Sequence, residues 1–150
     1  MSKSITTDRQ KANNTLELLL DGIKKRDKEA IRELFSKQAI EEAGNFEESL
    51  DDLLCFFKGE IISYDDWAGV GTDGVYQDGK KRTELQSSFD ITTSEQTYHM
   101  AIKECTIDTF DQNNVGVMSV YIITADNWKK DVAYRGDGKW TPGIVIKEKD

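Results

Sequence analysis

Histidine and cysteine, which most often hold metal ions in small proteins, are scarce in this sequence. Its 150 residues include one histidine, His99, and two cysteines, Cys55 and Cys105, which are far apart and not in a CxxC pair. Zinc sites draw on closely spaced cysteines and histidines, so we expect no metal, and nothing indicates a cofactor. Both cysteines lie in apolar segments, which favours buried, unreactive thiols; a disulfide between them is the alternative.

Long hydrophobic runs and an excess of positive charge are also missing. The longest apolar run is only a few residues, so the sequence contains neither a signal peptide nor a transmembrane segment. Taken as written, it predicts a cytoplasmic protein; a cell-surface lipoprotein is the alternative if a signal segment was trimmed. The net charge is −8, which repels phosphate, so we expect no nucleic acid as a partner, whereas a protein with a basic surface fits this charge.

Proline is nearly absent, and no repeat, linker or low-complexity stretch interrupts the chain. The one proline is Pro142, and 150 residues is a common size for one domain that buries a core without metal or disulfide. We therefore predict a single domain over residues 1–150, helical over about 8–58 and folded as antiparallel sheet over 59–147.

The first third of the chain has the apolar spacing of three short amphipathic helices. We expect helix caps at Asp8, Asp27 and Asn45, because short polar side chains there precede each apolar run. Gly59 follows the last run and is expected to end the third helix. The predicted apolar stripes are Ala12, Leu16, Leu19, Leu20 and Ile23; Ala30, Ile31, Leu34 and Phe35; and Phe46, Leu50, Leu53, Leu54 and Phe57.

From residue 60 onward the apolar period changes to two, which is the side-chain period of a β-strand. Residues 115–124 are apolar on both faces, so we expect a central strand there. Short turn-like connections between consecutive strands predict an antiparallel meander. The predicted fold class is α+β, with N-terminal helices packed on a curved antiparallel β-sheet. The expected strands are 60–67, 82–92, 96–108 and 115–124, and the expected turns are 93–95, 111–114 and 136–139.

Four stretches of the chain resemble a known family: residues 12–22, 28–36, 57–63 and 111–116. The family, domain of unknown function 5104, is functionally uncharacterised, occurs in Gram-positive bacteria and includes many lipoproteins. The resemblance spans most of the chain and implies a cystatin-like cone of the nuclear transport factor 2 type, in which helices and a bent sheet enclose a pocket. That superfamily contains enzymes, ligand binders and partner-binding proteins. No functional residues are established for the family, so the resemblance assigns neither a function nor a site.

Two short motifs match functional patterns in letters only. Residues 69–74 read GxGxxG, but no helical period follows them to hold a pyrophosphate, so we expect a flexible hairpin loop. Residues 111–116 hint at a calcium loop. The hint fails because Val115 replaces an oxygen ligand and Ile122 stands where the bidentate glutamate belongs.

The single histidine is the remaining candidate for acid–base chemistry. A general base has to reach its substrate, and His99 alternates with Tyr98 and Met100 along a predicted strand. If those two residues face the helices, His99 points away from any pocket between helices and sheet. We therefore predict no catalytic residue, and the sequence favours a protein without enzymatic activity while leaving that question open.

Charge changes sign along the helical part of the chain. Residues 24–37 are rich in lysine and arginine, whereas residues 41–66 are rich in aspartate and glutamate. An ordinary solvated face is one interpretation. The other is a negative patch that docks a basic partner, because complementary charge speeds association and favours specificity. The carboxylates of this predicted acidic patch are Glu47, Glu48, Asp51, Asp52, Asp65 and Asp66.

The large aromatic residues have two interpretations as well. Tyrosine and tryptophan are hydrophobic side chains with one polar atom, so they fill cores or line ligand cavities. Core packing is the default. The alternative is a ligand pocket lined by Tyr64, Trp67, Tyr98 and Tyr121.

These features favour a non-enzymatic binding protein, for example an acidic, immunity-type inhibitor of a partner protein. The alternative is a small-molecule pocket, in a ligand-binding lipoprotein domain or an isomerase- or dehydratase-like enzyme. A pocket of that kind requires a cavity of roughly 300 Å³ or more with a few convergent polar groups. A homodimer through the open face of the sheet is a third option.

Overall fold

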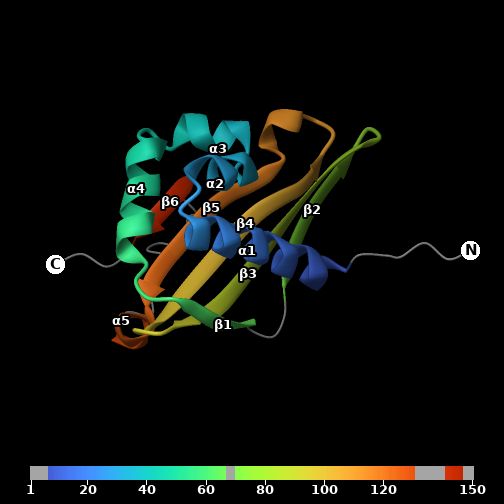
Figure 1. Ribbon diagram of the computed structural model, residues 1–150. Coiled ribbons are helices and arrows are strands. Elements are labelled where there is room, and N and C mark those ends of the chain that lie inside the picture. The colour runs from blue at the N-terminus through green and yellow to red at the C-terminus, as the bar shows by residue number, and fades with distance from the viewer. Residues whose placement is uncertain (1–6, 67–69, 131–140, 147–150) are drawn as a thin grey trace, which may run out of the picture.

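The computed structural model describes residues 7–66, 70–130 and 141–146 and shows an α+β fold with one open, mixed sheet of six strands (Figure 1). The predicted fold class α+β is therefore confirmed. The predicted turn at 136–139 lies outside the described residues. The elements are α1 (Asp8–Lys25), α2 (Lys28–Leu34), α3 (Lys37–Glu42), α4 (Phe46–Phe56), β1 (Ile61–Asp66), β2 (Gly71–Gln77), β3 (Lys80–Thr93), β4 (Thr97–Asp108), the 3₁₀ turn η1 (Gln112–Asn114), β5 (Gly116–Thr124), α5 (Ala125–Lys130) and β6 (Gly143–Ile146).

The first helix begins at Asp8, the residue that was expected to cap it. Thr7, not Asp8, is the cap: its hydroxyl accepts a hydrogen bond from Gln10 N (3.1 Å), and Gln10 Oε1 accepts one from Thr7 N (2.9 Å). This reciprocal pair is a capping box, which satisfies two backbone donors that a helix start leaves open. Asp8 lies in the first turn of α1, where its negative charge interacts favourably with the positive end of the helix dipole.

The segment before β1 contains four helices rather than the predicted three. Asp27 and Asn45 cap α2 and α4, as predicted. Between them the chain becomes extended at Phe35 and forms an isolated parallel bridge with Val117 of β5. Ser36 then caps α3, a helix that the apolar spacing did not indicate. The tertiary contact with β5 thus splits what would otherwise be one helical region.

The sheet has the strand order β1-β3-β4-β5-β6, and β2 also pairs with β3. β4 pairs with β3 along residues 82–92, while β1 pairs with residues 89–93 and β2 with residues 80–86 of the same strand. β1 and β2 therefore follow each other along the side of β3 that faces away from β4. Within the described residues β1 is an edge strand.

Two predictions about the sheet are wrong. β6 pairs with β5 in parallel, not antiparallel, and parallel neighbours cannot be joined by a tight hairpin. Most of the expected 69–74 loop is strand: β2 begins at Gly71 and ends at a tight turn. That turn contains Asp78 (φ 53°) and Gly79 (φ 77°), the two positive φ values that a two-residue hairpin of type I′ requires.

Side chains fill the space between the helices and the sheet. On β3, Leu85, Phe89 and Ile91 are buried as the alternation predicts, and Tyr98, Met100 and Ile102 of β4 join the same core. Irregular register between β3 and β4, and between β4 and β5, marks bulges that bend strands. The helix residues that pack onto this face with exposures of 1% or less are Ala12, Leu16, Leu19, Ile31, Leu50 and Leu53.

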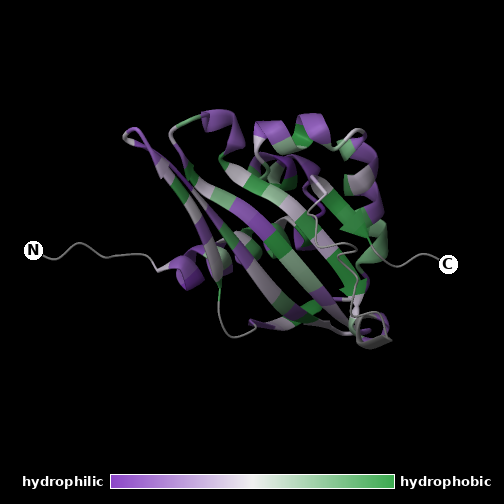
Figure 2. Ribbon diagram, turned by 180° about the vertical axis from the view of Figure 1, so that it is seen from behind, coloured by the Kyte–Doolittle hydropathy of each residue, from purple (hydrophilic) through white to green (hydrophobic). Residues whose placement is uncertain are grey.

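The opposite face of the sheet carries a second, smaller apolar cluster of Ala101, Tyr121 and Ile123. Figure 2 views the molecule from behind and shows hydrophobic (green) stretches along the strands. β5 is thus buried on both faces, as predicted for a central strand. Cys105 is buried, but the prediction for Cys55 is wrong: it is exposed, because it lies on the solvent side of α4. Both thiols are free, so the alternative of a disulfide between them is also wrong.

Candidate functional site

A groove runs between the C-terminal half of α1 and the segment that leads from α4 into β1. It consists of two cavities of about 410 Å³ and about 470 Å³, which share Lys24 and Ile61. We call the whole depression the α1–β1 groove, the first cavity its inner section and the second its outer section. The inner section is lined by Ile23, Lys24, Arg26, Phe57, Gly59, Glu60 and Ile61, and the outer section by Glu17, Leu20, Asp21, Lys24, Ile61, Ile62, Ser63 and Tyr64.

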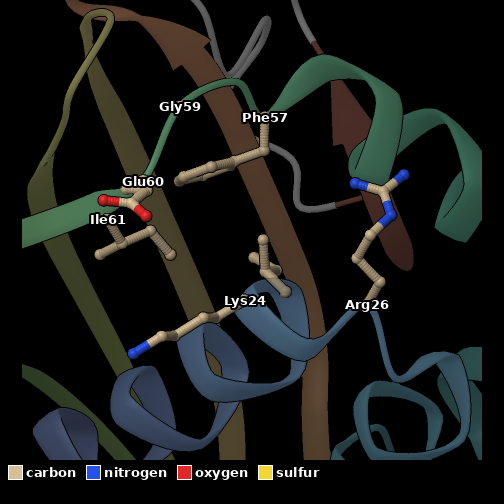
Figure 3. A pocket seen from close by; sticks show the side chains of 7 residues that line it. Lys24, Arg26, Phe57, Gly59, Glu60 and Ile61 are labelled. Carbon is tan, nitrogen blue, oxygen red and sulfur yellow. The ribbon is translucent and has the colours of Figure 1, made fainter.

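The inner section has a mixed lining of apolar side chains and charged groups. Figure 3 shows Lys24 extending from α1 on one side, and Phe57, Glu60 and Ile61 on the other side, on the segment that leads from α4 into β1. The Phe57 ring is held in place because it stacks on Tyr98, with 4.4 Å between the ring centroids. The wall of the cavity at α4 is therefore rigidly supported from the core.

Backbone geometry at both ends of the inner section depends on particular residues. α1 ends because Arg26 adopts a left-handed conformation (φ 52°), and its guanidinium donates a hydrogen bond to Leu54 O (3.3 Å). Gly59 has a φ of 89°, and a Cβ there would lie 2.8 Å from Ser94 Oγ and 2.9 Å from Thr93 Oγ1. A side chain at position 59 would clash with the turn at residues 93–95, so this close approach of the chain to the turn requires glycine.

Two side chains of opposite charge in the inner section are available to a ligand. Lys24 and the carboxylate of Glu60 make no hydrogen bond or ion pair with any residue that the structure describes. Other charged groups of the groove are engaged: Asp21 pairs with Lys25 (3.1 Å), and Glu17 accepts a hydrogen bond from Tyr64 (2.7 Å). Lys24 and Glu60 are thus the groups that a bound molecule would meet first.

The outer section is closed at its far end by contacts between α1 and β1. The hydrogen bond to Glu17 raises the pKa of Tyr64 to about 12, so its hydroxyl is a protonated donor at neutral pH. Farther along β1, Asp66 receives two hydrogen bonds from Arg9 (2.7 and 2.8 Å) and one from Asn13 (3.3 Å). The hydrogen bond from Arg9 holds the pKa of Asp66 below its usual value. These contacts fix β1 against α1 and set the width of the groove.

The structure does not bring the four aromatic residues of the predicted pocket together. Tyr64 lines the groove, and Trp67 lies outside the described residues. Tyr98 is fully buried in the core below the helices. Tyr121 lies on the opposite face of the sheet, where its hydroxyl accepts a hydrogen bond from Thr141 N (2.6 Å).

The predicted acidic patch splits into two groups, four carboxylates on α4 and two on β1. Lys28 forms ion pairs with Glu47 (3.8 Å) and Asp51 (2.7 Å), and Arg32 forms another with Glu47. The basic helix α2 therefore neutralises part of the α4 face. On β1, Asp66 is paired as described above. The carboxylates of the patch with no ion pair among the described residues are Glu48, Asp52 and Asp65.

His99 lies on the sheet face away from the main core, as the alternation predicts. Its Nδ1 is 2.9 Å from Asp90 Oδ1, and the two residues are register partners in β4 and β3. A carboxylate orients the histidine in many catalytic sites, but His99 does not line the α1–β1 groove. Among the residues that the structure describes, no group of three His, Cys, Asp or Glu residues is placed to hold a metal ion.

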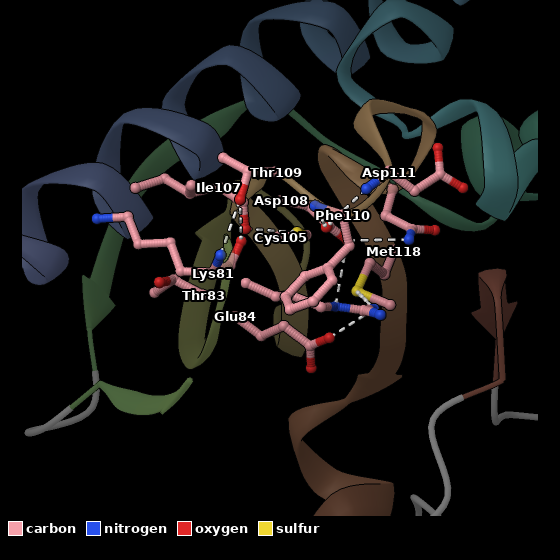
Figure 4. A network of polar contacts seen from close by, with 12 residues as sticks. Lys81, Thr83, Glu84, Cys105, Ile107, Asp108, Thr109, Phe110, Asp111 and Met118 are labelled. Atoms are coloured by element: carbon pink, nitrogen blue, oxygen red, sulfur yellow. Dashed lines mark hydrogen bonds and ion pairs between the residues drawn. The ribbon is translucent and has the colours of Figure 1, made fainter. Parts of the chain in front are cut away.

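A polar network at the opposite end of β4 surrounds Asp108 (Figure 4). Its carboxylate accepts hydrogen bonds of 2.9 Å from the backbone N–H groups of Phe110 and Asp111 and from the side chain of Asn114. Arg82 Nε lies 3.6 Å away. Burial alone would raise the pKa of Asp108, but these hydrogen bonds and the positive charge of Arg82 together lower it. The network holds the turn between β4 and β5.

The groove was not predicted because its two walls are distant in the sequence. Lys24 belongs to the basic stretch and Glu60 to the acidic stretch, and nothing local to either residue indicates the other. They become neighbours only because α4 returns the chain to the end of α1. Of the residues that line the groove, the sequence indicated only Tyr64, because its aromatic, partly polar side chain is of a kind that lines pockets.

The fold and the groove define a small α+β domain with a ligand-sized depression at the edge of its sheet. The chain belongs to the family described as Domain of unknown function (DUF5104), whose family model matches residues 18–125. The matched region contains Lys24, Glu60 and the rest of the groove apart from Glu17. No curated protein is significantly similar to the chain. Among the described residues, no helix combines the length and apolar character needed to span a membrane.

Proposed function

We propose that this chain is a non-enzymatic binding protein whose ligand occupies the α1–β1 groove. The observation that carries the proposal is the inner section, about 410 Å³, in which Lys24 and Glu60 lie over Ile23, Phe57 and Ile61. Ligand sites typically have volumes of roughly 300 Å³ or more, an apolar lining and a few convergent polar groups. The inner section has the volume and the polar groups, and Ile23, Phe57 and Ile61 supply the apolar part of a mixed lining, so a ligand with an apolar body and at least one charged group fits it.

The immunity-type inhibitor that the sequence favoured, in which the acidic surface masks a basic partner protein, has weaker support than the pocket that was its alternative. A net charge of −8 would steer a basic partner toward the molecule. However, Lys28 and Arg32 already pair with Glu47 and Asp51 on the α4 face. We therefore assign the contact with a partner to the groove and not to α4.

We also propose that the fold is the cone of the nuclear transport factor 2 type and that the protein acts as a monomer. Helices packed on one face of the sheet and bulges in β4 and β5 support the cone. The apolar cluster of Ala101, Tyr121 and Ile123 is already buried on the opposite face, which disfavours a homodimer through that face. A cytoplasmic location and a lipid-anchored one at the cell surface are both compatible with a groove open to solvent.

A ligand screen followed by NMR spectroscopy would test the proposed site. We expect apolar molecules that carry a carboxylate, an amine or both to shift the amide signals of residues 57–64. Lys24→Glu should weaken binding of carboxylate ligands by about tenfold or more, because it replaces the cation of the groove with a repelling charge. Lys37→Glu is the matched control, since Lys37 is exposed on α3 outside the groove and the net charge changes equally. Equal binding by the two variants, or shifts outside the groove, would contradict the proposal.

A further inference from the structure

We infer that β1 binds an extended peptide with alternating apolar and basic residues as an additional strand of the sheet. The inference rests on the proposed function, because the peptide would occupy the outer section of the same groove. It starts from the position of β1, which pairs with β3 on one side and has no strand on its other side among the described residues. An exposed sheet edge supplies main-chain hydrogen bonds, and adjoining pockets select alternate side chains of the added strand.

The outer section supplies a shallow, open depression on the helix side of β1. It has a volume of about 470 Å³ and is lined in part by the apolar side chains of Leu20, Ile61 and Ile62. Ile62 is 66% exposed, an unusual state for an isoleucine in a strand that borders a cavity. The register of β1 shifts between Ile61 and Ser63, which places a bulge at Ile62. Strand pairing is therefore expected along Ser63–Asp66, with Ile62 contacting an apolar side chain of the peptide.

The other face of β1 specifies the charge of the peptide. Asp65 is the register partner of Asp90, so two carboxylates lie directly opposite each other on neighbouring strands. Asp90 Oδ1 lies 2.9 Å from His99 Nδ1, whereas Asp65 is exposed and has no ion pair among the described residues. Like charges in opposite positions are unfavourable. A lysine or arginine on an added strand, next to Asp65, would remove this repulsion.

The same charges disfavour a second copy of this chain as the occupant. Antiparallel pairing of β1 with β1 of another copy would bring the acidic residues Asp65 and Asp66 of the two edges close together. Four carboxylates at one strand junction would repel each other, and only Asp66 has a cation, Arg9, within reach. A basic peptide is attracted by the charges that repel a second copy.

The test uses the full chain and a fluorescein-labelled peptide, Val-Lys-Val-Lys-Val-Lys, at low ionic strength. Two derivatives carry N-methyl groups, one on the three valines and one on the three lysines. In an added strand the N–H groups of alternate residues point to the same side, so only one of the two derivatives should lose binding, by about tenfold or more. The isomer Val-Val-Val-Lys-Lys-Lys has the same charge but cannot alternate, and it should bind more weakly than the parent peptide.

Protein variants separate strand pairing from general charge attraction. Asp65→Asn should weaken binding of the alternating peptide several-fold, whereas Asp52→Asn, which removes an equal charge from an exposed residue of α4, should leave it unchanged. The inference is overturned if the two N-methylated peptides bind equally, if the block isomer binds as well as the alternating one, or if the two variants are equivalent. Small ligands that bind in a Lys24-dependent way while the peptide does not would overturn this inference alone. Failure of both kinds of ligand would also overturn the proposed function.

Discussion

The buried carboxylate of Asp108 is stabilised by several hydrogen-bond donors that surround it. Hydrogen bonds from Phe110 N, Asp111 N and the Asn114 side chain hold the carboxylate in the turn between β4 and β5. Asp108→Ala leaves these donors without an acceptor, and we expect it to lower the free energy of unfolding by about 2–4 kcal/mol at pH 7. Urea denaturation would measure the change, with the exposed Asp52→Ala as a control that should have little effect.

The pH dependence of this loss follows from the direction of the pKa shift. Because the pKa of Asp108 is lowered in the folded protein, its stabilising effect is present above the ordinary aspartate pKa and disappears as the pH falls through the folded value. Wild type and Asp108→Ala should therefore differ less at about pH 3 than at pH 7. A difference in stability that does not change with pH would show that the carboxylate acts only through its shape.

Glu104 has the opposite pH behaviour. It is 7% exposed, it accepts a hydrogen bond from Thr15 Oγ1 (2.6 Å), and its other oxygen, Oε1, has no hydrogen-bond partner among the described residues. Burial raises its pKa, and Thr15 and Lys11 oppose this only in part. The stability that comes from its protonated form is present below the ordinary glutamate pKa and is lost as the pH rises through the folded value.

Glu104→Gln should therefore stabilise the protein at neutral pH, because it removes a buried charge and keeps the shape of the side chain. We expect the free energy of unfolding to rise by roughly 1 kcal/mol at pH 7 and to be nearly unchanged at about pH 4. Urea denaturation at the two pH values would show this. A variant that is less stable than the wild type at pH 7 would indicate that the ionised carboxylate has a partner in the folded protein.

At the scale of helices and strands, local signals were sufficient for some elements and not for others. Asp27 and Asn45 cap helices because a short polar side chain satisfies backbone donors at close range, so sequence spacing alone predicts them. α3 and β6 depend on distant contacts: α3 begins where Phe35 meets Val117, and β6 pairs with β5 in parallel. Tyr64 was expected near a pocket from its own side chain, whereas the position of Lys24 and Glu60 on the two sides of one groove depends on how distant segments pack.

The junction between α2, α3 and β5 depends on Gly116. Its φ is 130°, and a Cβ would lie 2.7 Å from Ser36 N and 3.0 Å from Phe35 C. Gly116→Ala should lower the free energy of unfolding by roughly 3 kcal/mol, because backbone atoms have to move in addition to the strained φ. Gly44→Ala is the matched control: its φ is 77°, but nothing lies within 4 Å of the added Cβ, so a loss of about 1 kcal/mol is expected. Equal losses in thermal or urea denaturation would show that the contact with Ser36 is not tight.

At the scale of the whole molecule, the two thiols differ in accessibility: one is exposed in the folded protein, and the other is expected to become exposed only when the protein opens. Cys55 is on the surface of α4, while Cys105 is 1% exposed within the sheet, and burial raises the pKa of its thiol. A thiol reacts as its thiolate, so Cys105 is protected both by the lack of access and by its protonation. Native protein should react quickly with one equivalent of a disulfide reagent such as dithionitrobenzoate, and with a second equivalent only after unfolding.

This difference makes Cys105 a reporter of how cooperatively the domain opens. In a Cys55→Ser variant, Cys105 should be labelled at a rate set by the population of the opened protein, and urea should accelerate labelling with the slope of global unfolding. A shallow or absent dependence on urea would mean that β4 becomes accessible through a local opening, and the sheet would then not unfold as one unit. A steep dependence would show that β3, β4 and β5 separate only when the helices leave their face, because Cys105 lies on the strand that joins both halves of the sheet.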